Sequence, residues 1–521
     1  MIEISKCPFL KRNRFLYRKI LLKTLITVNP LIENITGVQR HRAAIVRRDL
    51  SRPVRIALSA GILTPSKSFF DYGCGHAEDI TILREQGYNT AGWDPHFLPT
   101  NEIKAADVVN LGYVLNVIED DQERRQALTR AWELTRRVLI VAVQVWVGEV
   151  GRGHVAYNDG FITSRNTFQK YFEQQELRDY LGSVLGAEGI PAGLGIFFVF
   201  RHESDAEAFA ASRFRTRSSV SPARFSLKGY EEHLPVLQPL IDFVSARGRL
   251  PTTDELAGYD EIIKEFRTVT RAFEIIRRFT NSNDWQRVIE KHRQDLLVYI
   301  ALSRFQRRPQ FSALPVDLQL DIKAFFKSYK RACDEADKLL FSLGQQSTIL
   351  QACKESAIGK FVGNALYVHS SALNCLSAVL RVYEGCASRT FGQSEHATII
   401  KFRSDKPKVS YLFYPDFETD PHPALHSSMS ANLSDIFVSF RDYSESENPP
   451  VLHRKETFVT PDYPLYSKFA KLTAKEEKLG LLDNPVVIGT RRGWMERLSA
   501  HGVRVHGHRV SRTPQPSSDP T

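Results

Sequence analysis

Between residues 68 and 145 the chain alternates short apolar runs with amphipathic segments of helical period. Apolar runs of this length are typical of strands buried on both faces of a parallel sheet. The predicted strands are Phe69–Tyr72, Thr90–Trp93, Ala106–Ile118, Arg137–Val143 and Ile196–Phe200. The predicted helices between them are Glu78–Gln86 and Gln122–Arg136. This alternation predicts an α/β fold with a Rossmann-like parallel sheet.

The segments around this core follow other patterns. A helix carrying Ile45, Val46 and Leu50 is expected before the first strand, and a second is expected from Ser51, with Pro53 in its first turn. Residues 206–310 are rich in helical periodicity. Beyond them, the predicted features are one long helix whose apolar stripe runs from Leu318 to Leu340 and two alternating strands at Thr398–Phe402 and Lys408–Tyr414. The C-terminal part is therefore expected to be α+β.

Two acids and two glycines stand at the ends of the first two predicted strands. The first strand runs into Asp71, Gly73 and Gly75, and the second ends at Asp94. Glycines allow a tight turn and a ligand lying against bare backbone. An acid about 20 residues after such a turn is placed to hydrogen-bond a ribose diol. The pattern predicts a site for a nucleoside ligand.

The residue types disfavour a dinucleotide as that ligand. Glu78 stands where the third glycine of a dinucleotide motif is expected, so a pyrophosphate would meet a carboxylate. An acidic pocket suits a cationic ligand better. A ligand-free α/β core and another nucleotide remain open alternatives. Only twelve residues separate Asp94 from Asp107, which leaves no room for a full strand bearing an acid for an adenine amine.

Charge and cysteine content narrow the class of protein. The net charge of +11 over 521 residues indicates a polyanionic partner such as DNA, although an inert basic surface is the alternative. The six cysteines are scattered, which is typical of reduced thiols in a cytoplasmic protein. No apolar run is long enough to span a membrane, so no membrane partner is expected. Residues 1–38 form a basic extension that belongs to no core.

The turn Asp71–Gly75, the acid Asp94 and the segment Val114–Asp120 together resemble a class I S-adenosylmethionine-dependent methyltransferase. Longer segments resemble the bacterial DNA phosphorothioation-associated methyltransferases, over roughly residues 39–510. The segments that carry this resemblance are Arg42–Ile45, Leu50–Arg55, Gly92–Pro95, Val108–Val114, Asp159–Arg165, Thr167–Lys170, Asp321–Phe326, Lys406–Tyr411 and His453–Phe458.

The resemblance implies an enzyme that uses S-adenosyl-L-methionine in a system of DNA phosphorothioate modification, with DNA and proteins of that system as partners. The residue patterns divide the chain into the extension at 1–38, a class I methyltransferase domain at 39–205, a helical region at 206–310, an α+β domain at 311–510 and a disordered tail at 511–521. The arginines of the helical region either contact DNA or form a solvated face over an aromatic core. A non-catalytic DNA-binding accessory protein, whose methyltransferase fold senses the cofactor or is idle, is the alternative.

The candidate site residues follow from these placements. Asp71, Gly73, Gly75, Asp94, Asn110 and Leu111 are expected to line the cofactor. Tyr113, in the apolar run Ala106–Ile118 where its strand is expected to reach the carboxyl edge of the sheet, is a catalytic candidate. Arg165 and Lys170 lie in a segment that could fold over the crevice and are further catalytic candidates, although a purely structural lid is equally open.

A metal-dependent nuclease is a weaker alternative. Asp462, preceded by proline, and Glu476 with Lys478 match the spelling of a P-D…E-x-K motif. Its carboxylates need to lie on adjoining strands to share a cation. The Lys-rich context of Glu476 predicts a helix instead, which argues against a nuclease. His422 and His426 are separated by prolines and make a poor metal pair.

Overall fold

The computed structural model describes residues 38–145, 155–214, 233–392, 394 and 396–512. Nearly all of the basic extension at 1–38 and most of the tail at 511–521 lie outside the described residues. The chain forms two compact units, which we call the first unit (residues 1–202 with 390–393) and the second unit (203–389 with 394–521).

A six-stranded sheet forms the centre of the first unit, in the order β2-β1-β3-β4-β9-β8. Its strands are β1 (Phe69–Tyr72), β2 (Thr90–Trp93), β3 (Ala106–Gly112), β4 (Thr135–Ala142), β8 (Gly189–Gly193) and β9 (Ile196–Phe200). Strands β1 to β4 pair in parallel, while β9 is antiparallel to both β4 and β8. The expected α/β fold with a parallel-sheet core is confirmed.

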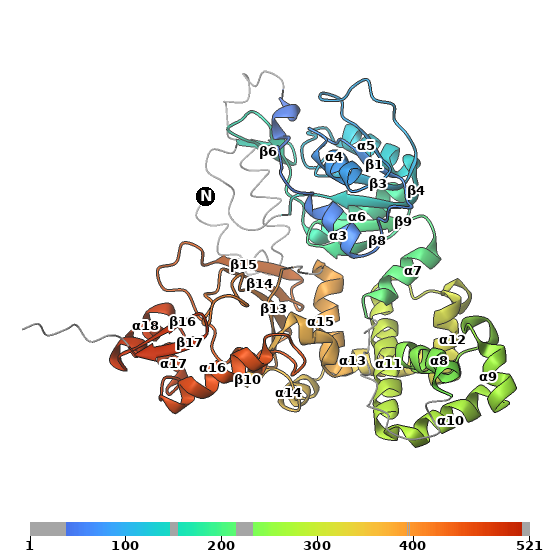
Figure 1. Cartoon of the computed structure of the whole chain (residues 1–521). Helices are drawn as coiled ribbons and strands as arrows, with labels where there is room; N and C mark the ends of the chain where they lie inside the picture. Colours follow the sequence, from blue (N-terminus) through green and yellow to red (C-terminus); the bar gives the residue numbers. More distant parts are fainter. Residues whose placement is uncertain (1–37, 146–154, 215–232, 393, 395, 513–521) are drawn as a thin grey trace, which may run out of the picture. The chain divides into compact units, whose positions relative to one another are not determined.

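Helices and one small sheet complete the first unit (Figure 1). The helices are α3 (Arg52–Ser59), α4 (Glu78–Glu85), α5 (Asp121–Leu134) and α6 (Gln174–Leu185), preceded by the 3-10 turn η3 (Arg40–Ala43). The small antiparallel sheet consists of β5 (Val155–Tyr157), β6 (Gly160–Ile162) and β7 (Phe168–Gln169). The helix expected around Ile45 and Val46 does not form. Both side chains are exposed, and the helix begins only after Ser51, where Pro53 fits the first turn.

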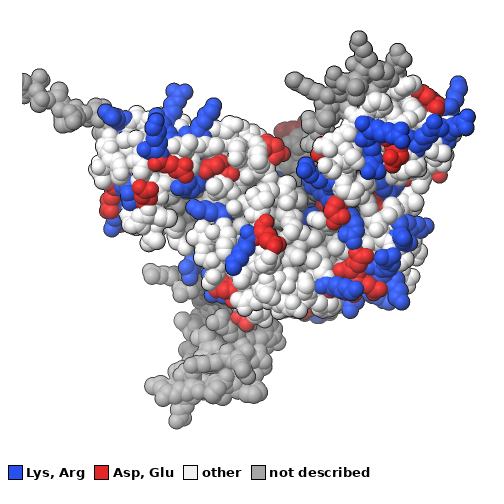
Figure 2. Space-filling model, turned by 90° about the horizontal axis from the view of Figure 1, so that it is seen from below, with Lys and Arg blue, Asp and Glu red and all other residues white. Residues whose placement is uncertain are grey.

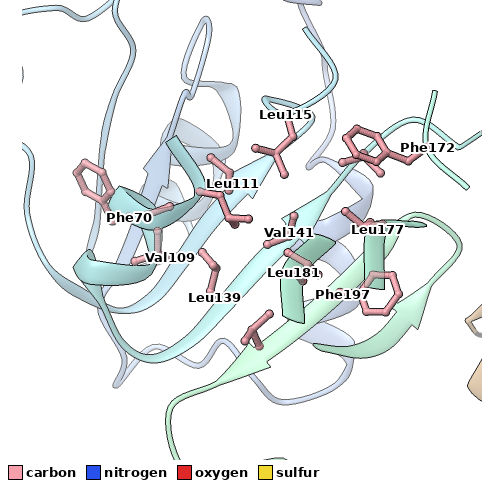
Figure 3. Close-up of a cluster of buried hydrophobic side chains, with 14 of the residues drawn as sticks. Phe70, Val109, Leu111, Leu115, Leu139, Val141, Phe172, Leu177, Leu181 and Phe197 are labelled. Atoms are coloured by element: carbon pink, nitrogen blue, oxygen red, sulfur yellow. The ribbon is translucent and has the colours of Figure 1, made fainter. Parts of the chain in front are cut away.

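The core of this unit lies between one face of the sheet and helices α5 and α6. Figure 3 shows Leu177 and Leu181 of α6 packed beside Val141 of β4 and Phe197 of β9. Strand residues alternate between the two faces of a sheet. Accordingly Val109 belongs to this core cluster, whereas Asn110 faces the other side. The long aliphatic and aromatic side chains here hold the strand ends in fixed positions.

No strand lies between β2 and β3 in the described part of the chain, as the short spacing predicts. Strand β2 is therefore the edge of the sheet. The side-chain amide of Asn101 donates a hydrogen bond of 3.0 Å to the carbonyl of Gly92, in place of a neighbouring strand. A surface hollow of about 440 Å³ lies beside this edge, lined by Arg84, Gly92, Asn101 and Lys104 among others.

The second unit begins with helices and continues with an antiparallel sheet. Its helices are α7 (Glu203–Ser212), α8 (Leu234–Arg247), α9 (Tyr259–Phe266), α10 (Val269–Phe279), α11 (Ser282–Leu302), α12 (Val316–Phe326), α13 (Tyr329–Ser342), α14 (Gln346–Lys354), α15 (Ala378–Phe391, whose end belongs to the first unit), α16 (Tyr466–Lys478), α17 (Pro485–Ile488) and α18 (Arg491–Ala500). Its strands are β10 (Lys360–Val362), β11 (Ala365–His369), β12 (Ile399–Arg403), β13 (Lys408–Phe413), β14 (Ser427–Asn432), β15 (Phe437–Asp442), β16 (Val503–His506) and β17 (Arg509–Arg512). Strands β10 to β15 pair in chain order as one sheet.

The structure corrects the single long helix expected between Leu318 and Leu340. Two helices, α12 and α13, occupy this stretch. The chain turns at Lys327, which has a φ of 66°, and Ser328 caps the next helix by accepting a hydrogen bond from the backbone N–H of Arg331. An apolar stripe survives this break because both helices bury one face, so periodicity alone does not reveal the turn.

No described helix combines the length and the apolar character that crossing a membrane requires. Five cysteines fall within the described residues, and none of them forms a disulfide: Cys74, Cys333, Cys353, Cys375 and Cys386.

Candidate functional site

The glycine turn follows β1 at the carboxyl edge of the sheet. Gly73 has a φ of 83° and Gly75 a φ of 55°, a region that side chains rarely adopt. A Cβ on Gly73 would lie 2.5 Å from Cγ2 of Val114, which follows β3. The turn after β1 therefore touches the turn after β3, and only glycine allows this approach.

Asp71 and Asn110 face each other across the pair β1 and β3. The Asn110 Nδ2 donates a hydrogen bond of 2.8 Å to Oδ1 of Asp71, and both side chains are buried. The next strand in the chain, β2, pairs with one side of β1, and the strand after it, β3, pairs with the other side. The strand order therefore reverses at β1. Open α/β sheets bind ligands in the crevice beyond the strand ends at such a reversal.

Two groups at this reversal are poorly satisfied. Burial raises the pKa of Asp71 to about 7, and the nearby carboxylate of Asp79 adds to the rise. Asn110 Oδ1 is buried and has no hydrogen-bond partner among the described residues. A buried acceptor without a partner costs free energy unless a ligand or a water supplies a donor. The site therefore favours a cationic ligand that carries N–H or O–H donors.

Asp94 closes the glycine turn. Its Oδ2 accepts a hydrogen bond of 3.0 Å from the backbone N–H of Gly75, and its Oδ1 accepts two more, each 2.9 Å, from the N–H groups of His96 and Phe97. The carboxylate is only 9% exposed. A carboxylate offers about four acceptor positions, so one remains for a ribose hydroxyl. Asp94 thus has a structural task in addition to the ribose contact expected from the sequence.

Aromatic rings border this turn, a feature that the sequence analysis missed. His41 stacks on His96 with ring centroids 4.2 Å apart, and His76 lies 4.2 Å from Phe97. The three histidines are exposed. Rings of this kind can stack on a nucleobase. The signal was present in the sequence, since His96 and Phe97 follow Asp94 directly and His76 follows Gly75.

Leu111 lies in the last part of β3, and Tyr113 comes directly after the strand. Tyr113, one residue beyond the strand, has a φ of 62° and a backbone N–H that donates to the carbonyl of Ala142 at 2.7 Å. A positive φ at an aromatic residue is strained, and such strain is common at functional sites. The Leu111 side chain is fully buried in the core, so only its backbone could meet a cofactor.

Lys170 lies within a buried ion-pair network. Its Nζ is 2.9 Å from Oδ2 of Asp159 and 2.8 Å from Oε1 of Glu176, and its side chain is 9% exposed. Arg124 donates two hydrogen bonds to the same Asp159, at 2.7 and 3.0 Å. Together these two cations lower the pKa of Asp159. Lys170 therefore anchors the β5–β7 sheet to helix α6.

Arg165 lies apart from this network. Its side chain is exposed in the turn between β6 and β7, and its backbone N–H donates to Oγ1 of Thr163 at 3.3 Å. Among the described residues, no hydrogen bond or ion pair joins Arg165 to Asp71 or Asp94. The sequence-based prediction of a shared catalytic site for Arg165, Lys170 and Tyr113 thus gains no support from their contacts.

The described residues contain no cluster of three or more His, Cys, Asp or Glu side chains that could hold a metal ion. Glu476, the second carboxylate of the nuclease spelling, lies buried in helix α16, while Asp462 is exposed in the turn before it. Glu476 Oε1 instead lies 2.8 Å from Nε2 of His422. The arrangement required by a metal-dependent nuclease is absent from these two elements.

No protein-family model matches the chain, and no curated protein matches it either. Among solved structures, the 1,6-didemethyltoxoflavin-N1-methyltransferase of Burkholderia thailandensis, with bound S-adenosylhomocysteine, is 14% identical and has a TM-score of 0.21, covering 36% of this chain and 88% of that chain. An amino pentose methyltransferase of Micromonospora echinaspora, with bound S-adenosylmethionine, is 14% identical at a TM-score of 0.22, with 32% and 92% covered.

A sugar N-methyltransferase from a Streptoalloteichus species is also 14% identical, with a TM-score of 0.24 and 33% and 97% of the two chains covered. Likenesses at these TM-scores carry no argument about this chain. The case for its site rests on the sheet topology and on the residues at the strand ends.

Proposed function

We propose that this chain is an S-adenosyl-L-methionine-dependent methyltransferase whose site is the crevice beyond β1, β2 and β3. One observation carries the proposal. The Asp71–Asn110 pair, with its unpaired acceptor, lies at the point where the strand order reverses, beside a glycine turn pinned by Asp94.

The residues present fit this cofactor. Its amino group and ribose hydroxyls are donors, and the site offers Asn110 Oδ1, the Asp71 carboxyl and the remaining acceptor position of Asp94. The exposed rings of His76 and His96 could stack on its adenine, in place of an acid on the strand that is missing. When bound, the cofactor supplies an electrophilic methyl group on a sulfonium.

The chain's own contribution to methyl transfer is then alignment. A nucleophile held in line with a methyl group needs little further assistance, because orientation alone removes much of the barrier. Tyr113, in its strained conformation beyond β3, is the side chain that we assign to positioning the acceptor. Gly73 allows the Val114 side chain to pack against the turn, and Val114 closes the crevice toward β3.

We further propose DNA as the methyl acceptor, within a system of DNA phosphorothioate modification. The support is the net charge of +11, which favours a polyanion, and the resemblance of the sequence to phosphorothioation-associated methyltransferases. Proteins of that system are the expected partners.

A second candidate is a non-catalytic, DNA-binding accessory protein that only senses the cofactor. Two observations favour it. The Lys170 ammonium is committed to Asp159 and Glu176, and Val114 already occupies the space against Gly73. Under this alternative the cofactor binds and no methyl group is transferred.

Two measurements on the full chain separate these readings. Calorimetric titration with S-adenosylmethionine tests the site, and incubation with methyl-labelled cofactor and DNA, with and without backbone sulfur, tests transfer. We expect binding and labelled DNA. Binding without labelled DNA would favour the accessory protein, and absence of binding would refute the proposed site. Asp107→Asn, at the opposite end of β3, serves as the matched control for substitutions of Asp71.

A further inference from the structure

Helices α8 to α10 and helices α11 to α13 follow the same plan. In each set a first helix is followed by a short 3-10 turn, η4 (Thr253–Glu255) in one and η6 (Phe311–Ala313) in the other, and then by two shorter helices. In each set the third helix packs against both the first and the second. We call residues 234–279 the first copy and residues 282–342 the second copy.

The buried positions of the two copies correspond. In the first helix and the 3-10 turn, each residue of the first copy corresponds to the residue 58 positions later in the second copy, as Leu256 does to Leu314. In the last two helices the separation is 60 positions, as between Phe266 and Phe326. The matched buried pairs are Leu240 with Val298, Val244 with Leu302, Leu256 with Leu314, Ile262 with Ile322, Phe266 with Phe326, Ala272 with Ala332 and Ile276 with Ala336. A shared core over this length identifies an internal repeat of one three-helix unit.

The two copies share an unusual junction between their second and third helices. Arg267 in the first copy and Lys327 in the second have φ values of 67° and 66°. The next residues, Thr268 and Ser328, cap the third helix, and each side chain accepts a hydrogen bond from the backbone N–H three residues later. Glycine would relieve the backbone strain at the turn. A long cationic side chain occupies the strained position in both copies instead.

Exposed cations repeat along with the core. Arg267, Arg271 and Arg278 in the first copy correspond to Lys327, Arg331 and Lys338 in the second. All six side chains are exposed, and none forms an ion pair with another described residue. On the right-hand side of Figure 2, over helices α8 to α12, blue side chains gather with red ones among them.

Most acids of the second copy, in contrast, are neutralised within the protein. Arg249 Nε lies 2.6 Å from Oδ1 of Asp321, and Arg308 lies 2.7 Å from Oδ1 of Asp337. Glu335 is bonded by an arginine of helix α11. None of the six matched cations forms an ion pair with a described residue, so all six are available to an anionic partner, and each third helix also carries one further acid between two of them, Glu274 in the first copy and Asp334 in the second.

We propose that the two copies bind the phosphate backbone of duplex DNA, each through its three matched cations. In each copy two residues join the second and third helices, a short connection that resembles that of helix-turn-helix motifs, whose last helix lies in a DNA groove. Tandem copies then contact two stretches of backbone, and their contributions to affinity reinforce each other. This inference rests on DNA being the partner in the proposed function and assigns the surface that holds it.

The test compares three sets of substitutions in the full chain. One removes the charges of the first copy (Arg267→Gly, Arg271→Gln and Arg278→Gln), and one removes those of the second (Lys327→Gly, Arg331→Gln and Lys338→Gln). The control removes three exposed lysines of helix α16 (Lys468→Gln, Lys471→Gln and Lys478→Gln), which changes the net charge equally. Circular dichroism confirms that each variant is folded.

Binding of a fluorescent duplex of about 30 base pairs is measured over a range of salt concentrations. Each lost phosphate contact reduces the slope of log affinity against log salt by about 0.9. We expect each copy's variant to lose up to about 3 in slope, with similar losses for both copies, and the α16 control to lose little. Equal losses in all three sets, or tighter binding of single-stranded RNA than of duplex DNA, would overturn the inference.

The outcomes also separate this inference from the proposed function. Cofactor binding in the first unit should be unchanged in all three variants. If the unsubstituted chain binds no DNA, both the DNA acceptor and this surface are refuted, while cofactor binding still tests the methyltransferase site. If it binds DNA and neither copy's variant weakens binding, only this surface is refuted.

Discussion

The amide of Asn110 donates to the carboxyl of Asp71 over 2.8 Å, across the two strands between which the sheet reverses its order. This bond fixes the orientation of both buried groups near the carboxyl edge of the sheet. It also leaves the carbonyl oxygen of Asn110 without a partner among the described residues. The pair is satisfied on one side only, which is the arrangement of a ligand site.

Cofactor affinity should rise with pH through about 7. Burial holds the pKa of Asp71 near 7, so much of this group is protonated at lower pH. A cationic ligand favours the ionised carboxylate, and binding therefore releases a proton. Calorimetry between about pH 6 and 8, in two buffers of different ionisation enthalpy, measures this release. Asp71→Asn should flatten the profile, and an unchanged profile would remove Asp71 from the site.

Substitution of Asp94 should affect both the turn and the ligand. Asp94→Ala removes the acceptor of three backbone N–H groups and should lower the free energy of unfolding by about 2–4 kcal/mol. Asp94→Asn keeps one side-chain oxygen for the turn and loses the charge. We expect it to be less destabilised than Asp94→Ala, because only the bond from Gly75 is lost, and to bind the cofactor at least about tenfold more weakly. Denaturation curves and calorimetry on both variants check this.

Tyr113→Gly should show whether the Tyr113 side chain acts in methyl transfer, because glycine removes the side chain without straining the backbone. Glycine tolerates the φ of 62° at this position, which offsets its larger loss of conformational entropy on folding. The stability should therefore change by less than about 1 kcal/mol. Methyl transfer to DNA should fall by at least about tenfold while cofactor affinity is retained. A variant with unchanged transfer would show that Tyr113 does not position the acceptor.

The buried pair of Glu476 and His422 should make stability depend on pH. Burial raises the pKa of Glu476 to about 7 and lowers that of His422 to about 3, so the folded pair is neutral at mildly acidic pH. An unfolded glutamate titrates near 4.5, so Glu476 binds more protons in the folded state between about pH 4.5 and 7, and its contribution to stability falls as pH rises through that window. The lowered pKa of His422 acts in the opposite direction up to about pH 6.5, so a variant of Glu476 is needed to isolate the glutamate.

Glu476→Gln cannot ionise and should gain stability relative to the original chain between about pH 5 and 8, by up to about 3 kcal/mol. Urea denaturation at the two ends of this window measures the gain. Glu477→Gln is the control because its side chain is 48% exposed. A pH-independent difference for Glu476→Gln would contradict a raised pKa.

The turn before the third helix has the same strained conformation in both copies, at Arg267 and at Lys327. We therefore expect matching effects of glycine substitution on stability. Arg267→Gly and Lys327→Gly relieve positive φ values of 67° and 66° and should each stabilise the protein by up to about 1 kcal/mol. Arg271→Gly lies within a helix and should destabilise it by about 1 kcal/mol. Thermal unfolding of the three variants measures these changes. Destabilisation by both turn substitutions would mean that the long side chains also support packing.

The sequence pattern was sufficient for the parallel sheet because its strands are uniformly apolar and end in acids and glycines. The strand predicted at Ile196–Phe200 has the same bounds in the structure, and the shortage of room after Asp94 correctly predicts the absent strand. These features depend only on local sequence.

Features that depend on tertiary contacts escaped prediction. The ion pairs of Lys170, which follows β7, join it to Asp159 in the turn before β6 and to Glu176 in helix α6. The break at Lys327 is hidden because both helices continue the same apolar stripe. The stacking of His41 on His96 joins segments far apart in the chain. No periodicity of hydrophobic positions encodes such contacts.

The backbone bonds accepted by Asp94 join the glycine turn at Gly75 to the turn after β2, so both turns already have their final shape before any ligand arrives. A nucleoside entering this crevice therefore would not have to order a loose segment first, and little chain entropy is lost when it docks. The rate of ligand binding at such a preformed site is set by how often the ligand and the protein meet in the right orientation.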